Sequence, residues 1–305
     1  MAISGKTVDT KQEQTESLRP PTGVDLWQRK SFQRIVRGFF AYIFLLVGST
    51  LFILPLLWMF STSLKPDVEV FEFPPRFLPT SWDWNNYYLA WTALPFTRYL
   101  LNTCIVTFSN VLGNLISCSL AAYGFARLRA RGSNVLFILV LATMMVPFQV
   151  TLIPTFILFS KLGWVNTLLP LTVPAWFGWA FSIFLLRQFF MGLPRELDDA
   201  ARIDGCSYFR IYWNIILPLS KPALATIAIF GFIGNWNNFL GPLVYINKQE
   251  LYTLALGLNL FRGQYVTYYN QLMAVSILSL APILIIFFFT QKTFIRGIAL
   301  TGIKG

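Results

Sequence analysis

Six long stretches without a charged side chain constrain this 305-residue chain more than any other feature. Each lacks Asp, Glu, Lys, Arg and His, and each exceeds the roughly 20 residues that a helix needs to cross a bilayer. Because no backbone group can be left unpaired in hydrocarbon, the stretches are expected to be helices rather than open strands. We predict an all-α membrane protein with six transmembrane helices, at residues 38–64, 99–126, 132–160, 162–186, 222–247 and 263–291.

Basic residues are divided unevenly among the segments between these stretches. Of the 24 Lys and Arg residues, 18 fall on one side, in the N-terminal tail, two loops and the C-terminal end. The positive-inside rule places both termini in the cytoplasm. The net charge of +11 is then mainly a topology signal, and its spread over four segments argues against nucleic-acid binding. We expect residues 1–35 to form a polar cytoplasmic tail and residues 36–305 the transmembrane domain.

The sequence contains few candidate catalytic or metal-binding residues. The chain has no histidine and three cysteines without metal-ligand spacing, so we predict no catalytic residue and no metal site. The segment Ser4-Gly5-Lys6-Thr7 lacks the earlier glycine of a phosphate-binding loop, so no ATP site is expected there. A self-sufficient ion-coupled carrier is disfavoured because such carriers usually bury ionisable residues, which the six stretches lack. A membrane enzyme that chelates a metal with the acids of the fourth-to-fifth loop is a further alternative.

That loop, residues 190–222, is the most charged interruption of the apolar pattern. From Asp199 to Pro218 it reads D-A-A-x3-G-x9-I-x-L-P. Pro194 suits a first helical turn, acids near a helix N-terminus are favoured by the dipole, and a glycine can end a helix. We predict a short helix outside the bilayer, which is either an ordinary interfacial helix or an element that transmits a push from a cytoplasmic partner. The candidate coupling residues are Glu196, Asp198, Asp199, Ala200, Ala201, Asp204 and Gly205, where the small alanines would let another surface approach closely.

Polar side chains inside two stretches suggest a solute pathway. Pro147 and Pro154 should kink the third stretch, with Gln149 beside the break. The fifth stretch carries Trp236, Asn237 and Asn238, and amides in lipid should face the bundle or a wet cavity. These amides either hold helices together or line a path for a hydroxyl-rich solute, with Trp236 offering a face for a sugar ring. The aromatic residues of the loop 65–98 similarly allow two readings, an interfacial anchor or a surface for a partner.

The loop resembles the EAA motif of permease subunits from binding-protein-dependent ABC importers, with Asp199 in place of the glutamate. Other segments resemble the carbohydrate-uptake branch, closest to the smaller, maltose-permease-type subunit. They are Asn102-Thr103, Ala121-Ala122-Tyr123-Gly124-Phe125-Ala126-Arg127, Met145-Val146-Pro147, Ile153-Pro154, Trp236-Asn237-Asn238-Phe239, where Asn238 replaces a glutamate, and Gly302-Ile303-Lys304-Gly305. The resemblance covers about residues 36–305.

The resemblance implies a type I ABC importer permease fold in a bacterial or archaeal plasma membrane. It implies a second, homologous permease subunit, a homodimeric cytoplasmic ATPase that holds ATP and Mg, and an extracytoplasmic solute-binding protein. ATP binding would pull the coupling helices together and open the cavity outward, and hydrolysis would reset it. The cargo would be a sugar or related polyol glycoside, or a glycerol-phosphate-type solute, and it would pass near Gln149, Trp236, Asn237 and Asn238.

Overall fold

The computed structural model describes residues 30–261 and 268–302, and every regular element within these ranges is a helix. Contacts divide the chain into two units, Met1–Trp58 and Met59–Gly305, which are described separately. The division falls inside an apolar helix, so it does not test the predicted tail at residues 1–35. Most of that tail lies outside the described residues.

The first unit contains most of helix α2 (Lys30–Ser63). The Thr50 hydroxyl donates to the Leu46 carbonyl at 2.8 Å, which satisfies a polar group within the helix itself. Its apolar part, Arg34–Ser63, is long enough to cross a membrane and contains the first predicted stretch almost entirely. The second unit begins with the last residues of this helix.

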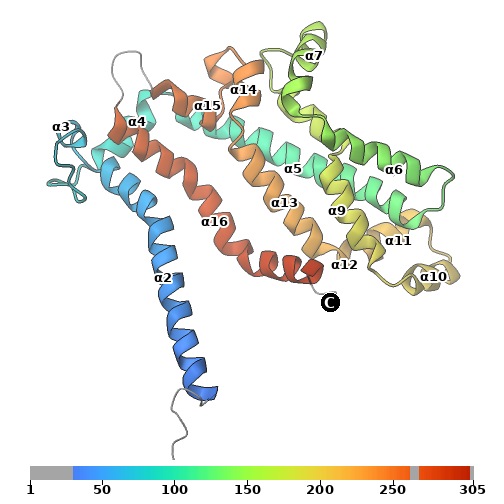
Figure 1. Ribbon diagram of the computed structural model, residues 1–305. Coiled ribbons are helices and arrows are strands. Elements are labelled where there is room, and N and C mark those ends of the chain that lie inside the picture. The colour runs from blue at the N-terminus through green and yellow to red at the C-terminus, as the bar shows by residue number, and fades with distance from the viewer. Residues whose placement is uncertain (1–29, 262–267, 303–305) are drawn as a thin grey trace, which may run out of the picture. The chain divides into compact units, whose positions relative to one another are not determined.

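Two long helices, α5 (Phe96–Arg127) and α16 (Tyr269–Gly302), frame the second unit. Helix α5 packs against α9 and α13, and α13 packs in turn against α16 (Figure 1). The other α-helices of this unit are α3 (Asp67–Val70), α4 (Asn85–Ala93), α6 (Ser133–Ala142), α7 (Phe148–Lys161), α8 (Leu169–Thr172), α9 (Ala180–Met191), α10 (Glu196–Ile203), α11 (Tyr208–Ile211), α12 (Leu217–Leu219), α13 (Lys221–Trp236), α14 (Leu240–Tyr245) and α15 (Leu254–Leu258). Single turns of tighter or wider helix complete the unit: η2 (Thr143–Met145), η3 (Val173–Phe177), η4 (Tyr212–Ile216), η5 (Gln249–Leu251) and η6 (Asn259–Phe261).

Four helical segments in the described residues are long and apolar enough to cross a membrane alone. Two further pairs meet the same criterion only together, because each is bent sharply. The bends are 98° between α6–η2 and α7 and 77° between α11–α12 and α13. The segments thus number four, or up to six if each bent pair is one span, which agrees with the all-helical prediction and leaves the count of six open.

Two of the breaks fall at residues that disfavour a regular helix. The chain bends at Pro147, as predicted, whereas Pro154 lies inside α7 without ending it. The fourth predicted stretch is interrupted at Gly178, whose φ of 94° is left-handed. The fifth predicted stretch, residues 222–247, is not one continuous helix, because α13 ends at Trp236 and α14 begins at Leu240.

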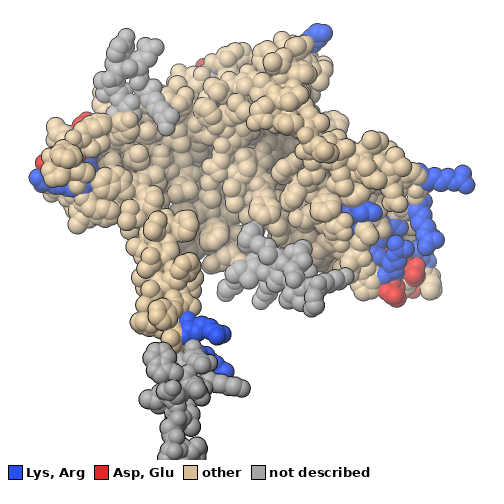
Figure 2. All heavy atoms as spheres, viewed as in Figure 1, with Lys and Arg blue, Asp and Glu red and all other residues tan. Residues whose placement is uncertain are grey.

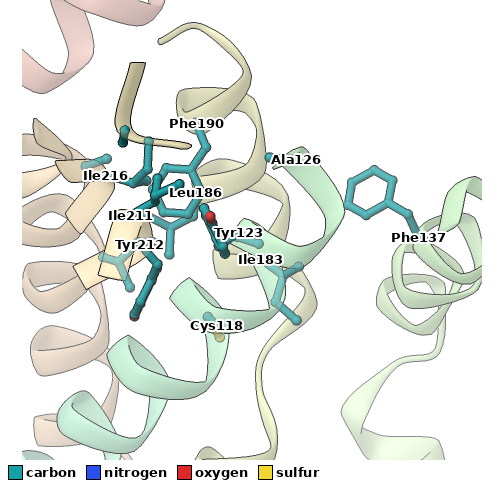
Figure 3. Packing of buried hydrophobic residues seen from close by; sticks show 14 residues of the cluster. Cys118, Tyr123, Ala126, Phe137, Ile183, Leu186, Phe190, Ile211, Tyr212 and Ile216 are labelled. Carbon is teal, nitrogen blue, oxygen red and sulfur yellow. The ribbon is translucent and has the colours of Figure 1, made fainter. Parts of the chain in front are cut away.

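A buried apolar cluster joins the ends of α5 and α9 to the segment that follows α10. Tyr123, Leu186, Phe190 and Tyr212 lie close together in it, as Figure 3 shows. The Ser119 and Tyr212 hydroxyls lie 2.8 Å apart, which pairs two polar groups inside this cluster. The cluster therefore fixes the loop 190–222 onto the membrane-spanning helices.

Charged side chains of the second unit gather at the ends of its long helices and leave a broad uncharged band between them (Figure 2). The densest group surrounds α10, where basic and acidic residues lie together. An uncharged band of this kind suits a bilayer core, where a charged group carries a large free-energy cost.

Candidate functional site

Helix α10 is a short, acidic helix with a well-defined end. Its first turn carries Glu196, Asp198 and Asp199, which favour the positive end of the helix dipole. At the other end the Gly205 N–H donates to the Arg202 carbonyl at 3.0 Å, and the next N–H donates to the Ala201 carbonyl at 2.9 Å. With a φ of 77° at Gly205, these bonds form a Schellman motif. The helix and its glycine stop are confirmed, although the helix begins at Glu196 and Pro194 precedes it.

The two alanines of the motif differ in exposure. Ala201 is 5% exposed and belongs to the buried cluster shared with α5 and α9, so it packs against other helices of the same chain. Ala200 is exposed, and Ile203 is 88% exposed although it is apolar. Glu196, Asp199 and Asp204 are also exposed. The free face of α10 is therefore acidic with an apolar centre.

A buried ion pair ties α10 to the end of α5. The Arg127 guanidinium lies 3.0 Å from an Asp198 carboxylate oxygen, and the two side chains are 3% and 17% exposed. Arg127 also donates to the carbonyl of Phe190 at 2.7 Å, in the last turn of α9, and to that of Leu193 at 2.9 Å, just beyond it. One side chain therefore joins the end of α5, the end of α9 and the first turn of α10.

The environment of Asp198 disfavours its charge. Burial raises the pKa of the Asp198 carboxyl above its ordinary value, and the neighbouring Arg127 guanidinium offsets only part of that shift. Desolvation thus outweighs the attraction between the two groups. The ion pair therefore fixes the position of α10 relative to α5, and its net contribution to stability is small.

Sequence reasoning assigned Arg127 to topology and family resemblance and missed its role as an anchor. An arginine at the end of an apolar stretch was the available signal, but its partner is distant in sequence. A polar cavity of about 410 Å³ opens beside the pair, and its wall includes Arg127, Arg129, Arg195, Asp198, Asp199 and Arg202. Side chains of both charge signs therefore line this cavity.

The predicted pathway residues differ in their exposure and in their contacts. Trp236 is 5% exposed, donates its indole N–H to the Ser279 carbonyl at 2.9 Å and stacks on Phe232. In this conformation it presents no open face to a solute. Asn237 and Gln149 are exposed, whereas the side-chain amide oxygen of Asn238 accepts from the Gly241 N–H at 3.1 Å, in the first turn of α14. Their role in a solute pathway stays a prediction.

Other amides hold helices together. Asn110 of α5 donates to the Leu171 carbonyl at 2.8 Å and lies 2.5 Å from the amide oxygen of Asn235 on α13. Asn102 of the same helix donates to the carbonyls of Glu250 and Tyr252. These amides of the second stretch, for which no pathway role was predicted, therefore make structural contacts.

Exposed aromatic rings occur where the fourth stretch is broken, and sequence reasoning missed them. Trp176 is 43%, Phe177 82% and Trp179 52% exposed. The Trp176 indole N–H donates to the Ser109 hydroxyl at 3.2 Å, which holds this ring on α5. Pro174 and Gly178 were the available signals in the sequence, because irregular backbone within a membrane usually lines a cavity or packs in protein.

Comparison with known proteins identifies the family. The family model described as binding-protein-dependent transport system inner membrane component matches residues 113–300, more than half of the chain. The chain belongs to this family. The α10 loop, its ion pair to α5 and the broken spans all lie within the matched region.

Curated relatives extend the similarity over most of the chain. It is 36% identical to the arabinooligosaccharides transport system permease protein AraQ of Halalkalibacterium halodurans, over 83% of this chain and 91% of the relative. It is 32% identical to the probable ABC transporter permease protein YurM of Bacillus subtilis, over 96% of this chain and 99% of the relative. It is 34% identical to the sn-glycerol-3-phosphate transport system permease protein UgpE of Yersinia pestis, over 85% and 95%.

A solved structure shares the fold. It is a chain of a bacterial ABC transporter involved in the import of the acidic polysaccharide alginate, with a TM-score of 0.78 and 25% identity. The match covers 86% of this chain and 98% of that one. The helical arrangement described above is therefore that of an ABC importer permease.

Proposed function

We propose that this chain is the sugar-conducting permease subunit of an ATP-driven importer and forms half of its translocation pathway. The observation that carries the proposal is the construction of α10. Its inner face is fixed to two membrane-spanning helices by Ala201 and by the Arg127–Asp198 pair, while its outer face is free. A force applied to α10 would reach the ends of α5 and α9 without first deforming a loop.

The outer face of α10 would receive a cytoplasmic ATPase. Ile203 supplies an apolar centre for burial, and Glu196, Asp199 and Asp204 supply charges that fix orientation. The polar cavity beside Arg127 would accept a side chain of the same partner. In this proposal α10 and both termini lie on the cytoplasmic side of the membrane, and the chain crosses the membrane six times between its two termini.

The remaining partners follow from the family. The chain would pair with a second, homologous permease, and an extracytoplasmic binding protein would deliver the solute. A homodimeric ATPase would hold ATP and Mg and carry out hydrolysis, so this chain itself would be no enzyme. Closure of that ATPase would draw the two α10 helices together and open the solute cavity outward.

The solute class is best described as an oligosaccharide or related polyol glycoside. The name of AraQ supports this class, and exposed aromatic rings such as Trp176 and Trp179 provide faces on which sugar rings stack. The name of UgpE supports a glycerol-phosphate solute as the alternative. Because the six apolar stretches hold no cation to neutralise a phosphate, a neutral sugar is favoured.

The decisive experiment measures ATP hydrolysis by the reconstituted complex, co-expressed with the neighbouring permease and ATPase genes. The binding protein is added with a panel of sugars and with sn-glycerol 3-phosphate. Stimulation by one sugar supports the proposal and names the cargo. Stimulation by glycerol phosphate alone supports the alternative solute, whereas uptake driven by an ion gradient without any ATPase refutes the importer.

The docking face can be tested by a matched pair of substitutions. Ile203→Glu should abolish co-purification of the ATPase and leave the amount of inserted permease unchanged, because an 88% exposed side chain contributes little to folding. Val68→Glu is the control, since Val68 is 84% exposed but lies in α3, in the loop 65–98. Equal recovery of the ATPase with both variants would show that α10 is not part of the docking site.

A further inference from the structure

An open cavity of about 660 Å³ lies where the end of α5, the first turn of α6, the end of α9 and the start of α10 meet. Its wall has no acidic residue and five arginines: Arg127, Arg129, Arg131, Arg187 and Arg195. Arg127 is neutralised by Asp198. Within the described ranges, no carboxylate forms a salt bridge with the other four. The wall of the cavity therefore carries an excess of positive charge.

The start of α6 adds to this positive charge. Gly132, with a φ of 81°, precedes the helix, whose first turn lines the cavity and has neither an acidic residue nor a capping side chain. The N–H groups of Asn134 and Val135 have no backbone partner among the described residues. Free N–H groups and the helix dipole make such a terminus attractive to an anion.

One arginine is held in place before any ligand arrives. The Arg187 guanidinium lies 4.1 Å from the centre of the Phe137 ring, and its Nε donates to the Phe125 carbonyl at 3.4 Å. These contacts restrict the side chain, so less conformational entropy is lost when its remaining N–H groups bind an anion. Pairing of a planar guanidinium with phosphate oxygens is geometrically favourable.

The surroundings distinguish an amphipathic ligand from a soluble one. Next to the cavity α6 presents Val135, Leu136, Ile138 and Leu139, each more than half exposed. This surface belongs to one of the bent pairs that are apolar enough to cross a membrane. A ligand with an anionic head and hydrocarbon chains would fill the cavity and cover this apolar face at once.

We propose that this arginine cavity binds the headgroup of an anionic membrane phospholipid, with the acyl chains lying along α6. The phosphodiester would contact the arginines and the first turn of α6. Because Arg127 and Arg195 border both this cavity and α10, the bound lipid would stiffen the connection between α10 and the membrane-spanning helices.

The test uses the full-length protein in detergent, together with any chains that accompany it during purification. Native mass spectrometry would count phosphatidylglycerol and phosphatidylcholine retained during titration with each lipid. The cavity variant is Arg129→Gln/Arg131→Gln. The control is Arg210→Gln/Lys221→Gln, which removes the same charge from exposed residues that border neither cavity.

We expect the wild-type protein and the control to retain phosphatidylglycerol in preference to phosphatidylcholine. The cavity variant should lose that preference by at least about tenfold, because hydrogen bonds between charged groups are removed. Arg187→Lys, which keeps the charge and changes the fork geometry, should retain part of the preference and would show that folding is intact.

Three results would overturn the proposal. Equal losses in the cavity variant and the control would indicate general surface charge. Equal stabilisation by the soluble headgroup glycerophosphoglycerol or by inorganic phosphate would indicate an anion site that does not need acyl chains. Loss of an accompanying protein chain with unchanged lipid retention would assign the arginines to a protein interface.

Discussion

Removing either partner of the Arg127–Asp198 pair should have very unequal consequences. Arg127→Met leaves the Asp198 carboxylate buried without a counter-charge and leaves the carbonyls of Phe190 and Leu193 without their donor. Loss of one partner of a buried pair costs about 3–5 kcal/mol. We expect a destabilisation of this size from Arg127→Met.

Asp198→Asn should cost less than Arg127→Met, because the amide keeps an oxygen that accepts from Arg127 and Arg127 keeps its bonds to the Phe190 and Leu193 carbonyls. Arg127→Met/Asp198→Leu should cost clearly less than Arg127→Met alone, since no unpaired charge is left. The same reasoning fixes the pH dependence. The pKa of Asp198 is higher in the folded protein than its ordinary 3.8, so the cost of its charge is fully present above the raised pKa and is relieved as the pH falls through it.

The assay is unfolding in mixed micelles with increasing SDS, followed by tryptophan fluorescence at neutral and at acidic pH. Arg210→Met serves as the matched control, because Arg210 is exposed and should contribute within about 0.5 kcal/mol. The cost of Asp198→Asn relative to wild type should grow at acidic pH, because only the wild type is stabilised when Asp198 takes up a proton. Equal costs for Arg127→Met and Asp198→Asn, or a cost below about 1 kcal/mol for Arg127→Met, would refute the reasoning.

Substitutions at three further positions test local packing by the same assay. Gly205→Ala should cost about 1–2 kcal/mol from its φ of 77° alone, since an added Cβ meets nothing within 4 Å, and Gly205→Asn should cost less; equal costs would contradict the strain argument. Trp236→Ala should lower stability by about 3–5 kcal/mol and Trp236→Phe by less, since the ring is buried and bonded to Ser279; wild-type stability with altered solute affinity would instead support a pathway role. Gly257→Ala should cost about 1–3 kcal/mol because its Cβ would overlap the Tyr99 ring, and an unchanged unfolding midpoint would show that this ring is free to move.

Local chemistry accounts for what could be predicted from the sequence. The absence of charge over each stretch determined that the chain is helical and membrane-spanning, because the cost of an unpaired polar group in hydrocarbon does not depend on tertiary detail. The bend at Pro147 and the end of α10 at Gly205 followed from the missing N–H of proline and the left-handed freedom of glycine.

Only the tertiary structure decided which side chains meet. Ala200 is exposed whereas its neighbour Ala201 lies in the core. Trp236 packs against Phe232 rather than facing open space. Arg127 and Asp198 are paired because α5 ends where α10 begins, a consequence of tertiary packing rather than of local sequence. The arginine cavity has the same origin, since α5, the loop after it, α6, α9 and Arg195 just before α10 each supply part of its wall. A sequence pattern specifies each helix and its apolar face, whereas contacts between distant segments depend on how these faces pack.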